Sequence, residues 1–178
     1  MKTIDLQPTL ENEFVKIQPL KDTDFEALYA VASDPLVWEQ HPNKDRYKRE
    51  VFENFFKGAM ESQGAFLVFD KQSNKVIGSS RFYELDAEKK TIAIGYTFMA
   101  KDHWGGIYNP ALKKLMMDYA FQFVNSVYYH IGALNIRSQK AIERLGAKKI
   151  SEMEMEYYGE PSKLNFLYEI RKEDWLKQ

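Results

Sequence analysis

The segment HWGGIYNP, residues 103–110, has the residue types of an anion-binding turn at the start of a helix. Its two glycines permit backbone conformations and close approaches that a side chain would block. Asn109 is a good helix N-cap and Pro110 suits the first helical position, so the free N–H groups of the first turn would point into the loop. Such a helix start attracts phosphate. A plain strand-to-helix turn around a buried Trp104 explains the same letters, because short glycine motifs have many false positives.

Two lysines, Lys113 and Lys114, follow in the early turns of this helix. The positive end of the helix dipole disfavours cations there unless a polyanion lies nearby. The pair therefore modestly favours a phosphate ligand. A solvated helix face is the alternative explanation.

Composition excludes several kinds of chemistry. The chain has no cysteine, and therefore no disulfide, thiolate metal site or cysteine nucleophile. His41, His103 and His130 lack the spacing of a metal motif, so we expect no metal. The 25 Lys+Arg nearly balance the 26 Asp+Glu, so we expect no nucleic acid partner. We expect no membrane association and a cytoplasmic protein, because neither a signal-peptide core nor an apolar run of spanning length is evident.

Hydrophobic periodicity predicts four helices and seven strands. Helices are predicted at about 22–32, 45–60, 110–125 and 135–145, the last closed by Gly146. Strands are predicted at about 14–20, 65–70, 75–84, 91–99, 127–134, 147–158 and 165–171. Polar turns join the strands between residues 65 and 99 into an antiparallel meander. The pattern predicts an α+β (mixed α/β) fold in a single domain over residues 1–178.

The strand predicted at 91–99 precedes the glycine loop. Strict alternation would put Ile92, Ile94, Tyr96 and Phe98 on one face. Gly95 interrupts the other face and indicates a bulge or a close backbone approach.

Two stretches carry a family resemblance: IGYTFMAKDHWGGIYNPALKKLMMDYAF, and YYHIGALNIRSQKAIERLGAKKI with N-x-x-S-x-x-A-x-x-x-x-G at Asn135, Ser138, Ala141 and Gly146. Together they resemble the core of GCN5-related N-acetyltransferases, the GNAT superfamily, from about Phe14 to Tyr168. Within it the chain is similar to the branch of ribosomal-protein N-terminal acetyltransferases. The usual phosphate loop, Q/R-x-x-G-x-G/A, is altered: its first position is Trp104, its usual glycine is Ile107 and its last small residue is Asn109. The amides that would touch phosphate are therefore left open.

The resemblance implies a mostly antiparallel sheet of about seven strands, splayed between strands 4 and 5 and flanked by about four helices. It also implies acetyl-CoA as co-substrate, with the pantetheine arm in the splay beside backbone groups of Phe98 and Met99. Asn135 and Ser138 would face the pantetheine or thioester. The diphosphate would rest on the loop residues Trp104, Gly105, Gly106, Ile107, Tyr108 and Asn109.

Transfer of an acetyl group to an amine needs a neutral nucleophile and a proton for the departing thiolate. Ser138 is a candidate donor on the thiolate side, although capping its helix is an equally good role. Glu84 is a candidate base, directly or through water, and Tyr83 and Arg81 share its strand. A solvated strand end explains these three as well.

Further residues would border the acceptor. Trp38 and His41 fall in the connection that commonly shapes the acceptor entrance of this fold, and His41 titrates in the right range for a base. The tyrosines Tyr157, Tyr158 and Tyr168 are candidates for the acceptor side, with core or hairpin packing as the alternative.

The sequence leaves the amine acceptor, the general base and the oligomeric state open, including a homodimer. The expected activity is N-acetyl transfer to a primary amine of a small molecule or a protein N-terminus. Because no base is obvious, a non-catalytic acyl-CoA-binding module remains an alternative. A nucleotide-phosphate site of another α/β protein is disfavoured, because neither G-x-x-x-x-G-K-[ST] nor G-x-G-x-x-G occurs.

Overall fold

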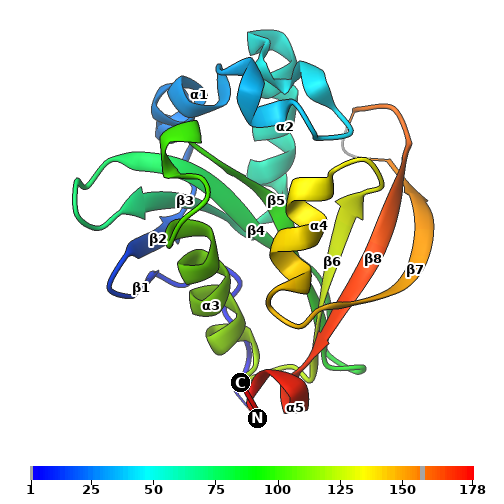
Figure 1. Ribbon diagram of the computed structural model, residues 1–178. Helices are drawn as coiled ribbons and strands as arrows, with labels where there is room; N and C mark the ends of the chain where they lie inside the picture. Colours follow the sequence, from blue (N-terminus) through cyan, green and yellow to red (C-terminus); the bar gives the residue numbers. More distant parts are fainter. Residues whose placement is uncertain (1, 157–158) are drawn as a thin grey trace.

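The computed structural model describes residues 2–156 and 159–178. Its eight-stranded sheet has the order β1-β2-β3-β4-β5-β6-β8-β7 (Figure 1). The strands are β1 (Leu10–Glu11), β2 (Val15–Pro19), β3 (Ala65–Asp70), β4 (Val76–Asp86), β5 (Thr91–Met99), β6 (Ser126–Gly132), β7 (Lys148–Met155) and β8 (Lys163–Arg171). The helices are α1 (Phe25–Ala32), α2 (Arg49–Ser62), α3 (Tyr108–Ala120), α4 (Ile136–Glu143) and α5 (Lys172–Trp175), with 3₁₀ turns at 22–24, 35–38, 44–47 and 101–103.

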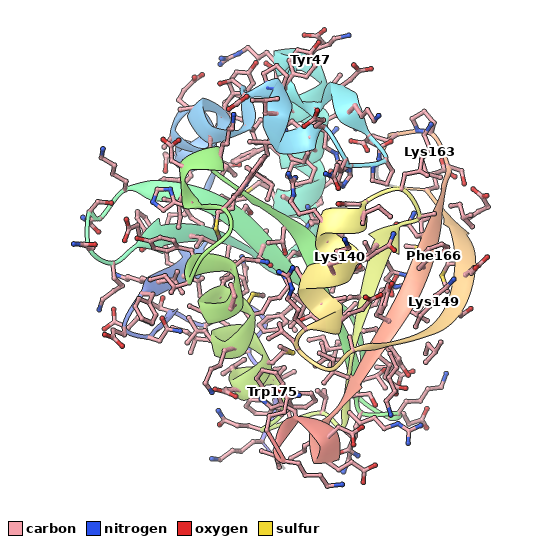
Figure 2. All side chains as sticks on the ribbon, viewed as in Figure 1. Tyr47, Lys140, Lys149, Lys163, Phe166 and Trp175 are labelled. Atoms are coloured by element: carbon pink, nitrogen blue, oxygen red, sulfur yellow. The ribbon has the colours of Figure 1, made fainter. Side chains whose placement is uncertain are left out.

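The mixed α/β, mostly antiparallel sheet predicted from the sequence is confirmed, since β5 and β6 form the one parallel pair among the neighbouring strands of the described residues. The sheet has one strand more than predicted, and α5 was not predicted. Both β1 and α5 are too short to show a period in the sequence. Trp175 fixes α5 against α3, because its Nε1–H donates to Asp118 at 2.7 Å (Figure 2).

The sheet separates two hydrophobic cores. Alternate residues of β3 show the division: Phe66 and Val68 belong to the core under α3, whereas Ala65 and Leu67 belong to the core with α1 and α2. Figure 1 shows α3 and α4 on the opposite side of the sheet from α1 and α2. Three aromatic residues of α2, Phe52, Phe55 and Phe56, fill this second core.

A β-bulge in β5 changes which face its residues occupy. Ser79 pairs with Phe98 but Arg81 pairs with Gly95, so β5 has one extra residue in this interval, and Tyr96 there has a φ of 54°. The prediction that Ile92, Ile94, Tyr96 and Phe98 share one face is therefore wrong. Ile92 and Ile94 lie in the α3 core, whereas Phe98 lies in the α1–α2 core. Gly95 indicated the bulge, but its neighbour carries the strained backbone.

The bulge also bends β5 away from β6. Pairing of the two parallel strands runs from Thr91 and Ser126 only as far as Ala93 and Tyr128. Beyond these residues the strands diverge. The splay predicted between the fourth and fifth strands of the resemblance is thus present, between β5 and β6.

Two helix starts border this splay. The prediction that Asn109 caps α3 and Pro110 opens it is wrong, because α3 begins at Tyr108 and no side chain caps it. Pro110 is tolerated as the third helical residue, since the first N–H groups of a helix have no intrahelical partner. By contrast, Asn135 caps α4: its Oδ1 accepts the N–H of Ser138 at 3.3 Å. Gly146, after this helix, has a φ of 94°.

Candidate active site

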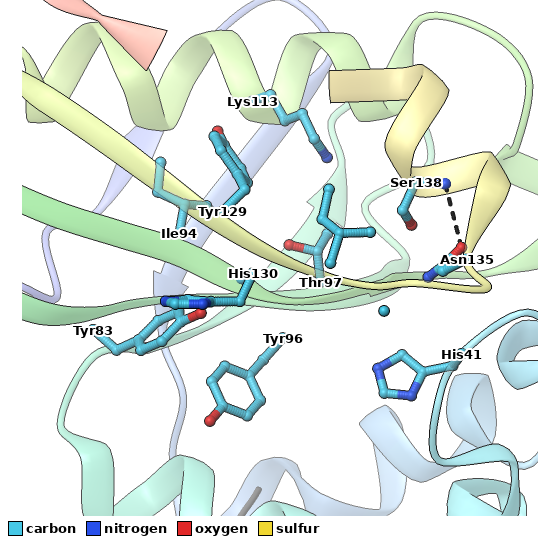
Figure 3. A pocket seen from close by; sticks show the side chains of 13 residues that line it. His41, Tyr83, Ile94, Tyr96, Thr97, Lys113, Tyr129, His130, Asn135 and Ser138 are labelled. Carbon is cyan, nitrogen blue, oxygen red and sulfur yellow. Dashed lines mark hydrogen bonds between the residues drawn. The ribbon is translucent and has the colours of Figure 1, made fainter. Parts of the chain in front are cut away.

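Two cavities meet where β5 and β6 separate. The larger, which we call the cleft, has a volume of about 470 Å³ and lies between the 97–110 segment and α4. The smaller, which we call the slot, has a volume of about 70 Å³ and passes between the two strands (Figure 3). Residues that line both cavities define their junction: His41, Thr97, Lys113, Asn135 and Ser138.

Most of the residues predicted to contact the coenzyme line the cleft, namely Phe98, Met99, Trp104, Gly105, Gly106, Asn109, Asn135 and Ser138. Ile107 and Tyr108 do not line it. Ile107 is 49% exposed, and the Tyr108 ring packs on His103 with centroids 4.6 Å apart. His103 in turn lies 3.3 Å from the Asp70 carboxylate, so this aromatic pair faces β3.

Trp104 holds the glycine loop against β5. Its Nε1–H donates to the Met99 carbonyl at 2.8 Å, and the Arg137 guanidinium lies 3.9 Å from its ring centroid. Gly105 has a φ of 66°, and a Cβ placed on Gly105 or Gly106 would meet no atom within 4 Å. The loop therefore presents bare backbone to open space beside the cleft.

Lys113 lies buried at the junction, and the sequence did not predict it as a site residue. It is only 9% exposed, and its Nζ donates to the Asn109 amide oxygen at 2.8 Å. Burial lowers its pKa to about 8. The solvated-face explanation holds only for Lys114, which is exposed and pairs with Asp118. A signal was present in the sequence, since Lys113 precedes the buried Met116 and Met117 by three and four residues.

Ser138 and Asn135 lie together at the first turn of α4, on the cleft side of the splay (Figure 3). The Asn135 amide oxygen already serves as the helix cap. Gln139 ties the same turn to the end of β6, because its Nε2 donates to the carbonyls of Gly132 and Ala133, both at 3.0 Å. The Ser138 side chain is thus held at the junction by a fixed backbone.

Glu84 lies outside the lining of both cavities. Its carboxylate is 3.1 Å from Nε2 of His130, which does line the slot. The hydrogen bond from His130 lowers the pKa of Glu84, which weakens this carboxylate as a base. Tyr83 of the same strand lines the slot, whereas the Arg81 guanidinium stacks 3.7 Å from the Tyr96 ring centroid. Burial lowers the pKa of Arg81 to about 10.

The connection between α1 and α2 covers the junction from the other face. Trp38 lines the cleft, and His41 lines both cavities. Burial and the nearby Arg46 charge hold the pKa of His41 well below its usual value. Its two ring nitrogens face donors, the Asn43 N–H at 3.0 Å and Arg46 Nη1 at 3.1 Å. Burial and the Arg46 charge therefore favour the neutral imidazole.

A buried ion pair fixes this connection to the far end of the sheet. Arg46 donates to both carboxylate oxygens of Glu160, at 2.7 and 2.8 Å, and its guanidinium lies over the Phe55 ring. The two partners are 114 residues apart, and no local pattern in the sequence indicates them. Tyr168 lines neither cavity but is buried in the core and bonds to Glu143, so of its two predicted roles the structure supports core packing. Tyr157 and Tyr158 lie outside the described residues.

Within residues 2–156 and 159–178, no group of three or more His, Asp or Glu side chains is arranged to hold a metal ion. None of the helices described there has the length and apolar character needed to cross a membrane.

Comparison with known proteins places this geometry in context. The family model described as an acetyltransferase (GNAT) domain matches residues 15–148. The fold is similar to a GCN5-related N-acetyltransferase from Brucella melitensis, with a TM-score of 0.83 and 20% identity over 96% of this chain and 81% of that one. It is also similar to a GNAT-family acetyltransferase from Bacillus anthracis (TM-score 0.69, 17% identity, 93% and 99% covered). A spermidine N-acetyltransferase from Vibrio cholerae, in complex with CoA and spermine, has a TM-score of 0.67 at 15% identity (93% and 99% covered).

Proposed function

This chain belongs to the GNAT acetyltransferase family, and from that premise we propose that it transfers the acetyl group of acetyl-CoA to a primary amine of a small molecule or a protein N-terminus. The observation that carries the proposal is the junction of the cleft and the slot at the splay of β5 and β6. A coenzyme thioester in the cleft and an amine in the slot would meet there without a covalent enzyme intermediate. The chain also has no cysteine to form one.

The cleft has the chemistry of a site for a polyanionic coenzyme. Arg137, Arg144 and Lys113 line it, and its lining contains no Asp or Glu among the residues that the structure describes. The diphosphate would rest on the amides of residues 105–109 and on the first turn of α3. The pantetheine amides would pair with the edge of β5 at Phe98 and Met99, because that edge has no β6 partner beyond Ala93.

The amine would approach from the α1–α2 face. Tyr83, Tyr96 and His130 line the slot on that side, together with His41. No carboxylate lines the described slot, so it offers neither a strong base nor a counter-ion for a polycation. An α-amine, with an ordinary pKa of 7.7–8.0, is neutral far more often at pH 7 than a lysine amine near 10.4. We therefore favour an α-amine, as in the ribosomal-protein N-terminal branch. Glu84 would act by orienting His130.

The proposal extends to the setting of the reaction. We propose that residues 1–178 act as one catalytic domain, and that the enzyme works in the cytoplasm. Each protomer holds both cavities within its own chain, so the reaction as proposed does not depend on a homodimer.

Calorimetric titration with acetyl-CoA, followed by a panel of amines, tests the proposal. A thiol reagent detects released CoA without background from the protein, because the chain contains no cysteine. The panel should pair α-amino peptides and amino acids with lysine-like and polyamine acceptors. Binding with α-amine-dependent CoA release is expected. Absence of binding at millimolar acetyl-CoA contradicts the proposal, and tight binding without turnover of any amine favours the non-catalytic acyl-CoA-binding module.

A further inference from the structure

Lys113 is a buried cation without a carboxylate partner among the described residues. Among the described residues, its Nζ donates to the neutral amide oxygen of Asn109 at 2.8 Å. Removing a charge from water costs several kcal/mol unless it is paired, and the N-terminal turns of a helix add to that cost. The burial of the Lys113 charge is explained if the ligand brings an anion to it.

The position of Lys113 indicates which anion this is. The side chain extends from α3 toward Thr97 and Ser138 at the junction (Figure 3). Lys113 lines the slot as well as the cleft, whereas Gly105 and Gly106 of the phosphate loop line the cleft alone. Lys113 therefore borders the junction, where the thioester must meet the amine. The anion that forms there during acyl transfer is the thiolate of the coenzyme.

We propose that Lys113 is a catalytic residue that stabilises the departing coenzyme thiolate and gives it a proton. The inference rests on the proposed function. The amine nitrogen forms a bond to the thioester carbon, the carbon–sulfur bond breaks, and its electron pair passes to sulfur. The proton moves from Lys113 Nζ to that sulfur. The lysine, then neutral, takes up the proton that the acylated nitrogen loses, directly or through the Ser138 hydroxyl, so no external acid or base is consumed.

Acid strength favours Lys113 over Ser138 for this step. An alcohol is a far weaker acid than a thiol, whereas a lysine whose pKa is lowered to about 8 lies close to the ordinary thiol value of about 8.5. Ser138 remains suited to orient the sulfur or to relay a proton. The other titratable or charged groups facing the cavities are His41, Tyr83, Tyr96, Tyr129, His130, Arg137 and Arg144. Burial raises the pKa of both Tyr96 and Tyr129, so neither tyrosine is an acid near pH 8.

The bound coenzyme itself reports on this contact. Because the protein has no cysteine, the ultraviolet absorbance of a thiolate in a complex with CoA comes from CoA alone. The wild-type complex should titrate with a thiol pKa lower than that of free CoA by about one unit or more, equivalent to about 1.4 kcal/mol. An unchanged thiol pKa in a saturated complex overturns the inference, and this result needs no variant.

Three variants separate the roles. Lys113→Met should lose the thiol shift and lower kcat by about 100-fold or more. Lys113→Arg should keep a cation near the sulfur but no transferable proton, so the thiol shift should persist while kcat stays low. We expect kcat/KM of the wild type to decline above about pH 8 as Lys113 loses its proton, and Lys113→Arg should remove this decline. The control is Lys114→Met, on the same helix but exposed, which should resemble the wild type.

The outcomes distinguish this inference from the proposed function. Wild-type protein that turns over acetyl-CoA while Lys113→Met keeps kcat within about threefold overturns the inference alone, since a proton donor contributes far more. Failure of the wild type to bind CoA overturns both. If Lys113→Met does not fold, the thiol titration of the wild type and the kinetics of Lys113→Arg still test the role of Lys113.

Discussion

The buried pair of Arg46 and Glu160 gives the sharpest test of how the acceptor side is held together. Their side chains are 1% and 6% exposed, and the guanidinium makes two hydrogen bonds to the carboxylate. It also lies 4.6 Å from the Phe55 ring centroid and 5.5 Å from that of Trp38. Glu160→Gln keeps the size of the side chain but removes its charge. The buried guanidinium would then lose its two ionic hydrogen bonds to Glu160.

Removing one partner of a buried pair costs about 3–5 kcal/mol, because the remaining charge is uncompensated. For a protein of this length, each kcal/mol lowers Tm by about 2–4 °C, so Glu160→Gln should lower it by roughly 6–20 °C. Urea denaturation at neutral pH measures the free energy of unfolding directly. Any folded variant should show a raised KM for the amine and a nearly unchanged affinity for acetyl-CoA, since the pair orders the acceptor-side connection and not the glycine loop.

A second arginine–glutamate pair provides the matched control. Arg49 bonds to Glu26 on the surface, where the side chains are 49% and 72% exposed. Glu26→Gln should therefore change the free energy of unfolding by less than about 1 kcal/mol. If Glu160→Gln lowers the free energy of unfolding no more than Glu26→Gln does, the buried pair does not stabilise the fold as its geometry implies.

Three further predictions concern the cleft. Gly105→Ala should cost about 1 kcal/mol and weaken acetyl-CoA binding, because its φ is 66°, whereas Gly106→Ala should be tolerated; thermal shift and calorimetry check both, and equal effects would contradict the strain argument. Trp104→Phe loses the bond to the Met99 carbonyl and should raise the Kd of acetyl-CoA about tenfold, with an unchanged Kd as the contrary result. The folded pKa of Lys113 is about 8 against an ordinary 10.5, so the unfolded chain binds more protons between these values and stability rises with pH across that window. The gap in unfolding free energy between wild type and Lys113→Met should change by up to about 3 kcal/mol from pH 8 to 10.5, and a constant gap would exclude the shift.

The sequence predicted those parts of the fold that local patterns encode. Strand β5 has its predicted bounds, Thr91–Met99. The sequence offered Ser138 as a cap of α4, but in the structure Asn135 provides the capping side chain and Ser138 only the backbone N–H. The start of α3 was misjudged because Asn109 satisfies the Lys113 amine instead of a backbone N–H. Asparagine is a good helix cap when judged from the local sequence. Only the folded chain shows that the Lys113 amine competes with the backbone for the Asn109 side chain.

Other features depend on contacts that no local pattern contains. Gly95 indicated a bulge in β5, but only the pairing with β4 shows that the extra residue moves Phe98 to the opposite core. Glu84 was a reasonable base from its place on a strand end, but its partner His130 comes from another strand and lowers its pKa. The spacing of Lys113 from Met116 and Met117 indicated that Lys113 lies on the buried face of α3. Its charge instead favoured the prediction of a solvated position.

A structure of the complex with CoA is the most direct test of the central claim. We predict the diphosphate within about 3 Å of the amides of residues 105–109, pantetheine along β5 beyond Ala93, and sulfur at the junction beside Lys113 and Ser138. A coenzyme that binds elsewhere, or a splay between β5 and β6 that stays closed to pantetheine, would contradict it.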